Sequence, residues 1–257
     1  MSVSINYNGR LGNHLFQYVA AFIFAKKFNF SLNTIFIDSQ FNLPQLNGSV
    51  YTDNKLIVND SNFLNLLNSD TIEPRHYIFD GFFQIKDFVL NYKEEIKSLF
   101  NLSYDKTDKD DVFVIYRIGD IGGLRQMLPI EFYQDALNNL SSKKGYITSD
   151  SPSHPNVITL SKEFNLTIYN DTPSETINFA KNFNNLVLSE GSFSWWIGVL
   201  SNSKNIYYNQ RERFWHGDIF VFPEWTPLYY DWDSECIVSN NRIICNKIKN
   251  NSTNDII

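Results

Sequence analysis

The segment VFVIYRIGD, residues 112–120, decides the fold of this chain. Its first five residues are apolar or aromatic and three of them are β-branched, which is typical of a strand buried on both faces of a parallel sheet. Arg117 follows that strand directly, ahead of a turn at Gly119 and Asp120. Because ligands of open parallel sheets bind beyond the carboxyl ends of the strands, the pattern places Arg117 at a ligand-binding edge.

Downstream of this segment, short apolar runs alternate with segments of helical periodicity. The expected helices are 130–140, 155–164, 174–183 and 194–200, and the expected strands are 146–148, 166–169, 186–188 and 206–208. Alternation of this kind predicts a doubly wound α/β sheet.

Upstream, a second unit begins with a strand at 3–7. A helix follows whose apolar residues recur at i, i+3 and i+4 up to Lys26 and Lys27, two cations that suit the negative end of a helix dipole. The other upstream expectations are a strand at 35–37, loops and short pieces over the irregular stretch 39–75, and an amphipathic helix over 85–100.

The polar run at 105–111 is typical of an inter-domain linker. We therefore predict two Rossmann-like α/β halves. The N-terminal lobe, 1–108, carries the segment GRLGNH on the acceptor side, and the C-terminal lobe, 109–245, carries the nucleotide-sugar site. A polar tail follows at 246–257. Two halves of this kind form a ligand cleft between them.

Composition disfavours several classes of protein. The formal net charge of −6 argues against nucleic acid as a partner, because duplex-binding domains are usually basic. No apolar run reaches the roughly 18 residues of a membrane span, and the N-terminus does not resemble a signal peptide, so we expect a cytoplasmic protein. Cys236 and Cys245 flank Asn240 and Asn241, which predicts a hairpin that carries two reduced thiols.

Three segments that follow predicted strands suit an anion. GRLGNH at 9–14 combines glycines with the free N–H groups of a helix start. RIGD at 117–120 supplies a guanidinium, and GSFSWW at 191–196 supplies two hydroxyls ahead of tryptophans expected in the core. Each segment also has a purely structural interpretation: an ordinary turn, an ion pair between Arg117 and Asp120, and a serine N-cap.

A pyrophosphate requires a cation and several donors at converging strand ends, and these segments offer both. When a nucleotide sugar reacts, the developing charge on the nucleoside diphosphate must be stabilised by arginine or by dipoles if no metal is bound. The sequence has no Asp-x-Asp pair in a loop suited to a divalent metal, so we expect metal-independent sugar transfer without a cofactor.

Taken together, these segments resemble glycosyltransferase family eleven, the α-1,2-fucosyltransferases. GRLGNHLFQY at 9–18 is similar to that family's G-G-L-G-N-Q-M-F-Q-Y, IYRIGD at 115–120 to its H-x-R-R-G-D, and GSFSWW at 191–196 to its S-S/T-F-S-W-W. DGFFQ at 80–84 is similar to its D-G-Y-F-Q, and Ser149-Asp150 to its F-S-D-D. The order and spacing hold over nearly the whole chain.

The resemblance implies a GT-B-like fold and inverting transfer of L-fucose from GDP-fucose to a hydroxyl of an acceptor glycan, in an α-1,2 linkage to galactose. It implies that Arg117 binds the β-phosphate and assists departure of the leaving group. It also implies a set of donor-binding residues: Gly12, Asn13, Ser192, Phe193 and Ser194.

The sequence departs from the family pattern where the nucleobase is concerned. Ile115 and Ile118 stand in place of a His and the second Arg, and Thr176 stands at an acidic position. Either Glu175 or Asp171 could supply the missing carboxylate.

Three residues are candidates for the catalytic base: Asp120, His14 and Glu190. Two alternatives to a fucosyltransferase stay open, namely a transferase with another nucleotide sugar on the same scaffold and a non-catalytic sugar-nucleotide-binding protein. Retention of Arg117 and of both serines of GSFSWW favours a working site. A dinucleotide-dependent oxidoreductase is disfavoured, because the glycines of GRLGNH do not follow G-x-G-x-x-G.

Overall fold

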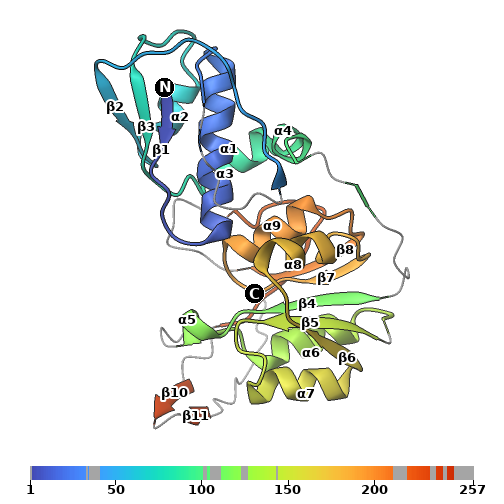
Figure 1. The fold of residues 1–257 in the computed structure, drawn as a ribbon. Helices are drawn as coiled ribbons and strands as arrows, with labels where there is room; N and C mark the ends of the chain where they lie inside the picture. Colours follow the sequence, from blue (N-terminus) through green and yellow to red (C-terminus); the bar gives the residue numbers. More distant parts are fainter. Residues whose placement is uncertain are drawn as a thin grey trace, which may run out of the picture.

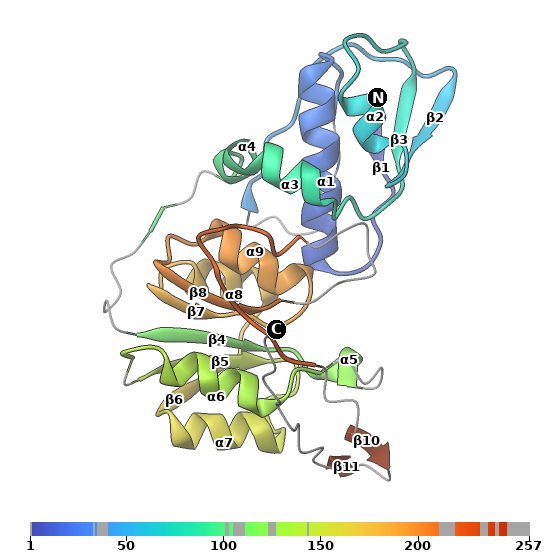
Figure 2. The same cartoon turned by 180° about the vertical axis from the view of Figure 1, so that it is seen from behind.

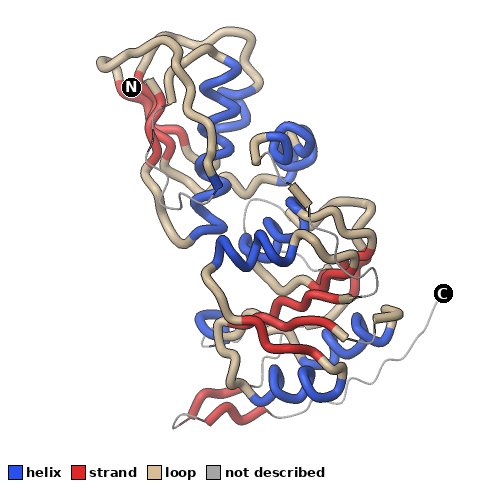
Figure 3. Tube along the Cα trace, turned by 45° about the vertical axis from the view of Figure 1, so that its right-hand side comes forward, coloured by secondary structure: helices blue, strands red, loops and turns tan. Residues whose placement is uncertain are grey.

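The computed structural model describes residues 2–32, 34, 41–100, 103–104, 111–122, 127–142, 144–210, 219–231, 236–239 and 242–245. Over these residues the protein is an α/β molecule with two parallel sheets, of three and six strands (Figure 1). Coloured by secondary structure, the two groups of strands lie apart from each other with helices between them (Figure 3). The predicted α/β class with two parallel sheets is therefore confirmed.

The six-stranded sheet is built from the C-terminal part of the chain. Its strands are β4 (Val112–Tyr116), β5 (Gly145–Ser149), β6 (Leu166–Tyr169), β7 (Asn185–Val187), β8 (Asn205–Asn209) and β9 (Thr226–Leu228). They lie in the order β6-β5-β4-β7-β8-β9, with every neighbouring pair parallel. Counted along the chain, this is the order 3-2-1-4-5-6 of doubly wound sheets, so the topological switch point lies between β4 and β7.

Strand β4 forms the centre of this sheet, as its apolar sequence predicted. All five of its residues are buried. Phe113 and Ile115 pack into one apolar cluster, whereas Val112, Val114 and Tyr116 pack into a second. The alternation shows that both faces of the strand are covered.

Helices cover both faces of the six-stranded sheet (Figures 1 and 2). On the face away from the smaller sheet lie α6 (Ile130–Asn138) and α7 (Pro155–Glu163), and on the face toward it lie α8 (Pro173–Ala180) and α9 (Ser192–Leu200). All four were predicted, with ends that differ by three residues at most. A short helix, α5 (Gly119–Gly122), follows the carboxyl end of β4.

Strand β9 was not predicted from the sequence. It has three residues with Pro227 at its centre, and proline within a run argues against a strand. The position of β9 at the edge of the sheet accounts for its tolerance of proline, since an edge strand has N–H groups that need no ladder partner.

The N-terminal part of the chain forms the smaller sheet, in the order β1-β3-β2 with parallel pairs. Its elements are β1 (Val3–Ile5), α1 (Leu11–Lys27), β2 (Lys55–Val58), α2 (Phe63–Leu67), β3 (His76–Phe79), α3 (Lys86–Asn91) and α4 (Lys93–Ser98). The predicted first strand and first helix are confirmed, and α1 ends at Lys27 as expected.

The stretch 39–75, where loops and short pieces were expected, contains the short elements β2 and α2, because Val58, Phe63 and Leu67 anchor its polar sequence in the core. One upstream expectation was wrong. The single helix expected over 85–100 is two helices, since the backbone of Tyr92 leaves the helical region at φ −116° and ψ 16°.

Other expectations concern residues outside those described: the strand at 35–37, all but the last residue of the linker at 105–111 with the lobe boundary near 108, and the tail at 246–257. The predicted C-terminal hairpin is confirmed in its backbone. Strands β10 (Cys236–Ser239) and β11 (Arg242–Cys245) pair antiparallel, with Cys236 opposite Cys245.

The two parts of the molecule meet where the first turn of α1 packs against α9. Trp195 and Trp196 are fully buried there, as expected of core residues. The ring of Phe16 lies 4.6 Å and 4.9 Å from their ring centroids, and Trp196 Nε1 donates a 2.8 Å hydrogen bond to the carbonyl of Gly12. This contact joins the first helix of one sheet to the helix that follows the switch point of the other.

Candidate functional site

The candidate site lies at the switch point, where β4 ends in Arg117 and β7 leads into α9. Gly191 precedes α9 with φ +100°, a conformation that favours glycine. A Cβ at Gly191 would collide with Nη1 of Arg117. The guanidinium of Arg117 therefore lies directly over the backbone at the positive end of α9.

Buried hydroxyls fix the backbone of Arg117. Its N–H donates to Ser189 Oγ over 3.1 Å, and Tyr133 Oη donates to the same oxygen over 3.1 Å. Burial raises the pKa of Tyr133 well above its usual value, so this phenol stays protonated and remains a donor. Ser189 thus ties the end of β4 to the end of β7 across the switch point.

The loop after Arg117 is held from the neighbouring strand. Asp150, at the end of β5, accepts hydrogen bonds from the backbone N–H groups of Ile118 at 2.8 Å and Gly119 at 2.9 Å. A Cβ at Gly119 would lie 2.9 Å from Asp150 Oδ2, which accounts for glycine at this position. The loop geometry is therefore set by two adjacent parallel strands.

Asp120 lies between two arginines. Arg117 donates to it through Nε at 3.0 Å and Nη2 at 2.7 Å, and Arg10 Nη2 contacts the same carboxylate from the N-terminal side of α1. The ion pair between Arg117 and Asp120 that the sequence allowed is present. The hydrogen bond from Arg117 chiefly, with the charges of both arginines, lowers the pKa of Asp120, although burial partly opposes the shift.

Gly12 and Asn13 approach this site from the other lobe. A Cβ at Gly12 would lie 2.7 Å from both the backbone N of Phe193 and Ser192 Oγ, so glycine is needed for the contact. Asn13 Oδ1 accepts from Ser192 Oγ over 2.9 Å and from Gln84 Nε2 over 2.9 Å. The first and third predicted segments meet, and the DGFFQ segment joins them through Gln84.

The residues of GSFSWW differ in how far they are open to a ligand. Ser192 and Phe193 are half-buried at the start of α9, whereas the side chain of Ser194 is 1% exposed. A ligand at this helix start would meet the hydroxyl of Ser192 and the free N–H groups of the first turn.

The candidate bases differ in their surroundings. His14 is 9% exposed and lies against Tyr7, with ring centroids 5.2 Å apart. Burial lowers its pKa from the usual 6.5, against a weaker opposing contribution from the backbone of Gly9, so the ring is neutral at pH 7. Glu190 is buried and accepts a 3.3 Å hydrogen bond from Asn209 Nδ2.

Asp171 lies in the turn between β6 and α8, and Glu175 lies in the first turn of α8. Thr172 accepts from the N–H of Glu175, as an N-cap does, and donates its hydroxyl to the carboxylate of Glu175. Asp171 accepts from the N–H of Thr172 at 2.8 Å and from Tyr169 Oη at 3.2 Å. Because β5 separates β6 from β4, the carboxyl ends of β6 and β4 stand about 10 Å apart along the sheet edge.

Sequence reasoning missed Arg10, Ser189 and Gln84. Arg10 stands inside the quoted segment GRLGNH, so a second cation in an anion-binding segment was a usable signal. Gln84 likewise stands inside the quoted segment DGFFQ, although its partner Asn13 lies 71 residues away. Ser189 carries no local signal of this kind, because its role depends on a partner 72 residues away.

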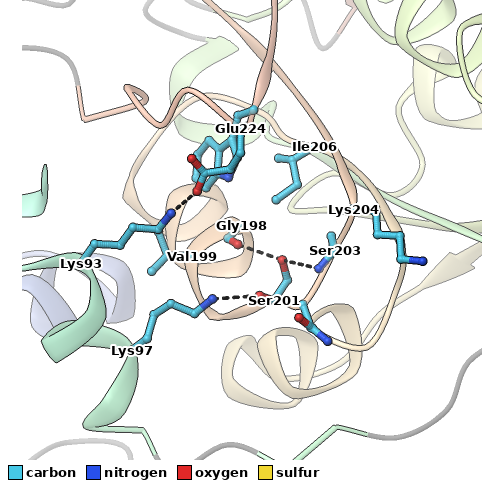
Figure 4. Close-up of a pocket in the computed structure, with 11 residues that line it drawn as sticks. Lys93, Lys97, Gly198, Val199, Ser201, Ser203, Lys204, Ile206 and Glu224 are labelled. Carbon is cyan, nitrogen blue, oxygen red and sulfur yellow. Dashed lines mark hydrogen bonds and ion pairs between the residues drawn. The ribbon is translucent and has the colours of Figure 1, made fainter.

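A cavity of about 470 Å³, which includes space open to solvent, lies at the opposite end of α9 (Figure 4). Lys93 and Lys97 of α4 border it. Lys93 pairs with Glu224, and Lys97 Nζ donates to the carbonyl of Ser201 over 3.4 Å. This cavity lies where α4 meets the C-terminal lobe, away from the switch point.

Among the described residues, no group of three or more His, Cys, Asp or Glu side chains is placed to hold a metal ion. None of the helices in the described ranges is both long and apolar enough to cross a membrane. Comparison of the chain with protein-family models, curated proteins and solved structures finds no match.

Proposed function

We propose that this protein is an inverting, metal-independent glycosyltransferase of GT-B-like architecture that transfers L-fucose from GDP-fucose to a hydroxyl of an acceptor glycan. One observation carries the proposal: Arg117 lies over Gly191 at the positive end of α9, at the switch point of a sheet with strand order 3-2-1-4-5-6. This is where doubly wound sheets bind nucleotides.

The diphosphate is the part of the donor that this arrangement suits best. A guanidinium and the free N–H groups of a helix start both stabilise phosphate oxygens. As the bond from the sugar to the β-phosphate breaks, negative charge develops on the leaving diphosphate, and Arg117 would stabilise that charge. Ser192 and the first turn of α9 would supply further donors.

The position of the turn between β6 and α8 supports a place for the nucleoside. About 10 Å along the sheet edge separates Arg117 from this turn, which is a distance that a nucleoside spans. Guanine presents N1–H and an exocyclic amine, and either Asp171 or Glu175 could accept hydrogen bonds from them. The present hydrogen bonds of both carboxylates lie within their own turn, so reading of guanine would require them to change partners.

His14 is the best suited of the three candidate bases to take the proton of the acceptor hydroxyl. Its neutral ring has a free electron pair to accept that proton, and it lies on the lobe opposite the diphosphate residues. Asp120 is less suited, because two arginines hold it ionised and lower its pKa. Glu190 is less suited because its carboxylate already accepts a hydrogen bond from Asn209.

A different nucleotide sugar is the second candidate donor. Ile115 and Ile118 are both buried in the apolar clusters, so neither position offers a polar group to a guanine. A site with few partners for the polar edge of a base discriminates weakly between bases.

A donor screen tests the proposal. The protein is incubated with GDP-fucose, GDP-mannose, UDP-galactose and UDP-glucose, and both donor hydrolysis and the thermal shift are measured. We expect GDP-fucose to give the largest shift and measurable hydrolysis. A larger response to a UDP-sugar would favour the second candidate. A shift without hydrolysis or transfer would indicate a binding protein, and no response to any donor would contradict the proposal.

A further inference from the structure

We propose that Arg10 is a second diphosphate-binding residue, supplied by the N-terminal lobe, and that Asp120 holds both arginines in place until the donor diphosphate replaces it. This inference rests on the proposed function and extends it to a residue of the segment GRLGNH to which the sequence analysis gave no role of its own. Its basis is the contact of one carboxylate with guanidinium groups from two lobes.

The geometry of this contact is that of an anion site already filled by an internal anion. Arg117 donates two hydrogen bonds to the Asp120 carboxylate, from Nε to Oδ1 over 3.0 Å and from Nη2 to Oδ2 over 2.7 Å. Arg10 contacts the second of these oxygens, Oδ2. Guanidinium forks bind carboxylate and phosphate oxygens in the same planar, two-point manner. A diphosphate offers more oxygens and more charge than one carboxylate does, so it can engage both arginines at once.

The electrostatic setting favours such an exchange. Arginine side chains beside the positive end of a helix are unfavourable without a compensating anion, and here Asp120 provides it. Two further carboxylates lie nearby but are engaged otherwise. Asp150 accepts from backbone N–H groups of the loop, and Glu190 accepts from Asn209. Replacement of Asp120 by a diphosphate would neutralise both guanidinium groups and the helix end together.

The three side chains are open enough for a ligand to reach them. The exposed fractions are 71% for Arg10, 38% for Asp120 and 33% for Arg117. Ion pairs this exposed contribute little to stability, so loss of the Asp120 contacts opposes binding only weakly. Because Arg10 stands on the N-terminal lobe, its engagement would also bring that lobe onto the donor.

Titration calorimetry with GDP and GMP tests the inference on the whole chain. We expect Arg10→Gln to weaken GDP binding about tenfold and to reduce the preference for GDP over GMP, because a charge-assisted contact to the terminal phosphate is lost. Arg10→Lys, which keeps the charge but not the fork, should fall between wild type and Arg10→Gln. Lys93→Gln, at the other contact between the lobes, is the matched control and should leave both affinities unchanged.

Asp120→Asn provides the second arm. If Asp120 competes with the ligand, this variant binds GDP about two- to fivefold more tightly than wild type. Equal GDP affinity in wild type and Arg10→Gln would overturn the inference while leaving the proposed function intact. Weaker GDP binding by Asp120→Asn would likewise overturn it, since Asp120 would then serve to position the arginines. A wild-type protein that binds no GDP would contradict both proposals.

Discussion

The two ends of helix α9 make the same kind of contact between lobes and yet differ in chemistry. At the N-terminal end, Arg10 of one lobe meets Asp120 of the other beside Arg117. At the C-terminal end, Lys93 of one lobe meets Glu224 of the other, and Lys97 donates to the carbonyl of Ser201. Both ends therefore join the lobes through cations.

The helix dipole separates the two contacts. Lysines at the C-terminal end complement the negative end of α9, so structure alone accounts for them. Arginines at the N-terminal end stand beside the positive end, where structure alone would favour anions. Arg10 and Arg117 therefore support the proposed ligand site at the N-terminal end of α9, although the cavity bordered by Lys93 and Lys97 lies at the other end.

The largest effect should come from Arg117→Ala. Loss of its contact to the leaving diphosphate is expected to raise the barrier to sugar transfer by about 2–4 kcal/mol, with the fold intact. Turnover of GDP-fucose, together with circular dichroism, measures both. Lys93→Ala at the opposite end of α9 is the control and should retain turnover. Near wild-type turnover of Arg117→Ala would leave its ion pair with Asp120 as the whole of its role.

The second largest effect should be a difference in stability between two glycine substitutions, Gly12→Ala at the N-terminal end of α9 and Gly198→Ala near its C-terminal end. A Cβ at Gly12 would lie 2.7 Å from the backbone N of Phe193, whereas a Cβ at Gly198 would meet the ring of Trp225 at 2.7 Å. Both changes should destabilise the protein, with a cost of about 1–3 kcal/mol for overpacking. Gly12→Ala should cost more than Gly198→Ala, because backbone atoms move aside less readily than a side chain does. Urea unfolding measures the difference.

The same pair separates stability from ligand binding. Gly12→Ala should also weaken GDP binding, because Ser192 would be displaced, and Gly198→Ala should not. Equal loss of GDP affinity in the two variants would show that the N-terminal end of α9 has no special part in binding.

Acid should weaken both contacts between the lobes, that of Asp120 and that of Glu224, and this effect should be smaller than that of the glycine substitutions. The pKa of Asp120 is lowered by its hydrogen bond from Arg117, and that of Glu224 is lowered because its contacts with Lys93 and with backbone outweigh the effect of burial. A carboxyl with a lowered folded-state pKa stabilises the fold at neutral pH and loses that contribution as pH falls through the folded-state pKa. The usual values are 3.8 and 4.5, so the loss falls below about pH 4.

Asp120→Asn and Glu224→Gln should each flatten the fall in thermal stability between pH 5 and pH 3, by no more than about 1 kcal/mol for side chains this exposed. Melting temperature measured against pH checks this. Wild-type steepness in both variants would show that neither carboxylate contributes to the acid sensitivity of the fold.

Removal of divalent metal should have the smallest effect. In the proposed mechanism Arg117 and the helix start would supply the stabilisation that a metal otherwise gives to the leaving group, so turnover with EDTA should equal turnover without it. Activity that disappears with EDTA and returns with Mn²⁺ would contradict metal-independent transfer.

The same contrast explains what the sequence revealed. The end of β4 was predictable because the apolar run VFVIY at 112–116 stops at a polar residue, Arg117. The position of Arg117 at a ligand-binding sheet edge follows from the alternation of strands and helices along the chain. Arg10 carried a local signal inside GRLGNH, but its pairing with Asp120 was not predictable, since the two residues lie 110 positions apart. In the stretch 39–75, polar composition hid β2 and α2, because a few buried side chains outweigh many turn-forming ones.

The most direct test of the central claim is calorimetric titration of GDP, UDP and ADP into the wild-type protein and into Arg117→Ala. The account predicts that wild type binds GDP more tightly than UDP or ADP, by a modest margin because Ile115 and Thr176 offer few partners to guanine, and that Arg117→Ala weakens GDP binding at least about tenfold. Equal affinity for all three would show that the base is not read. Absence of binding by every nucleoside diphosphate, or GDP affinity that does not depend on Arg117, would contradict a diphosphate site at the start of α9.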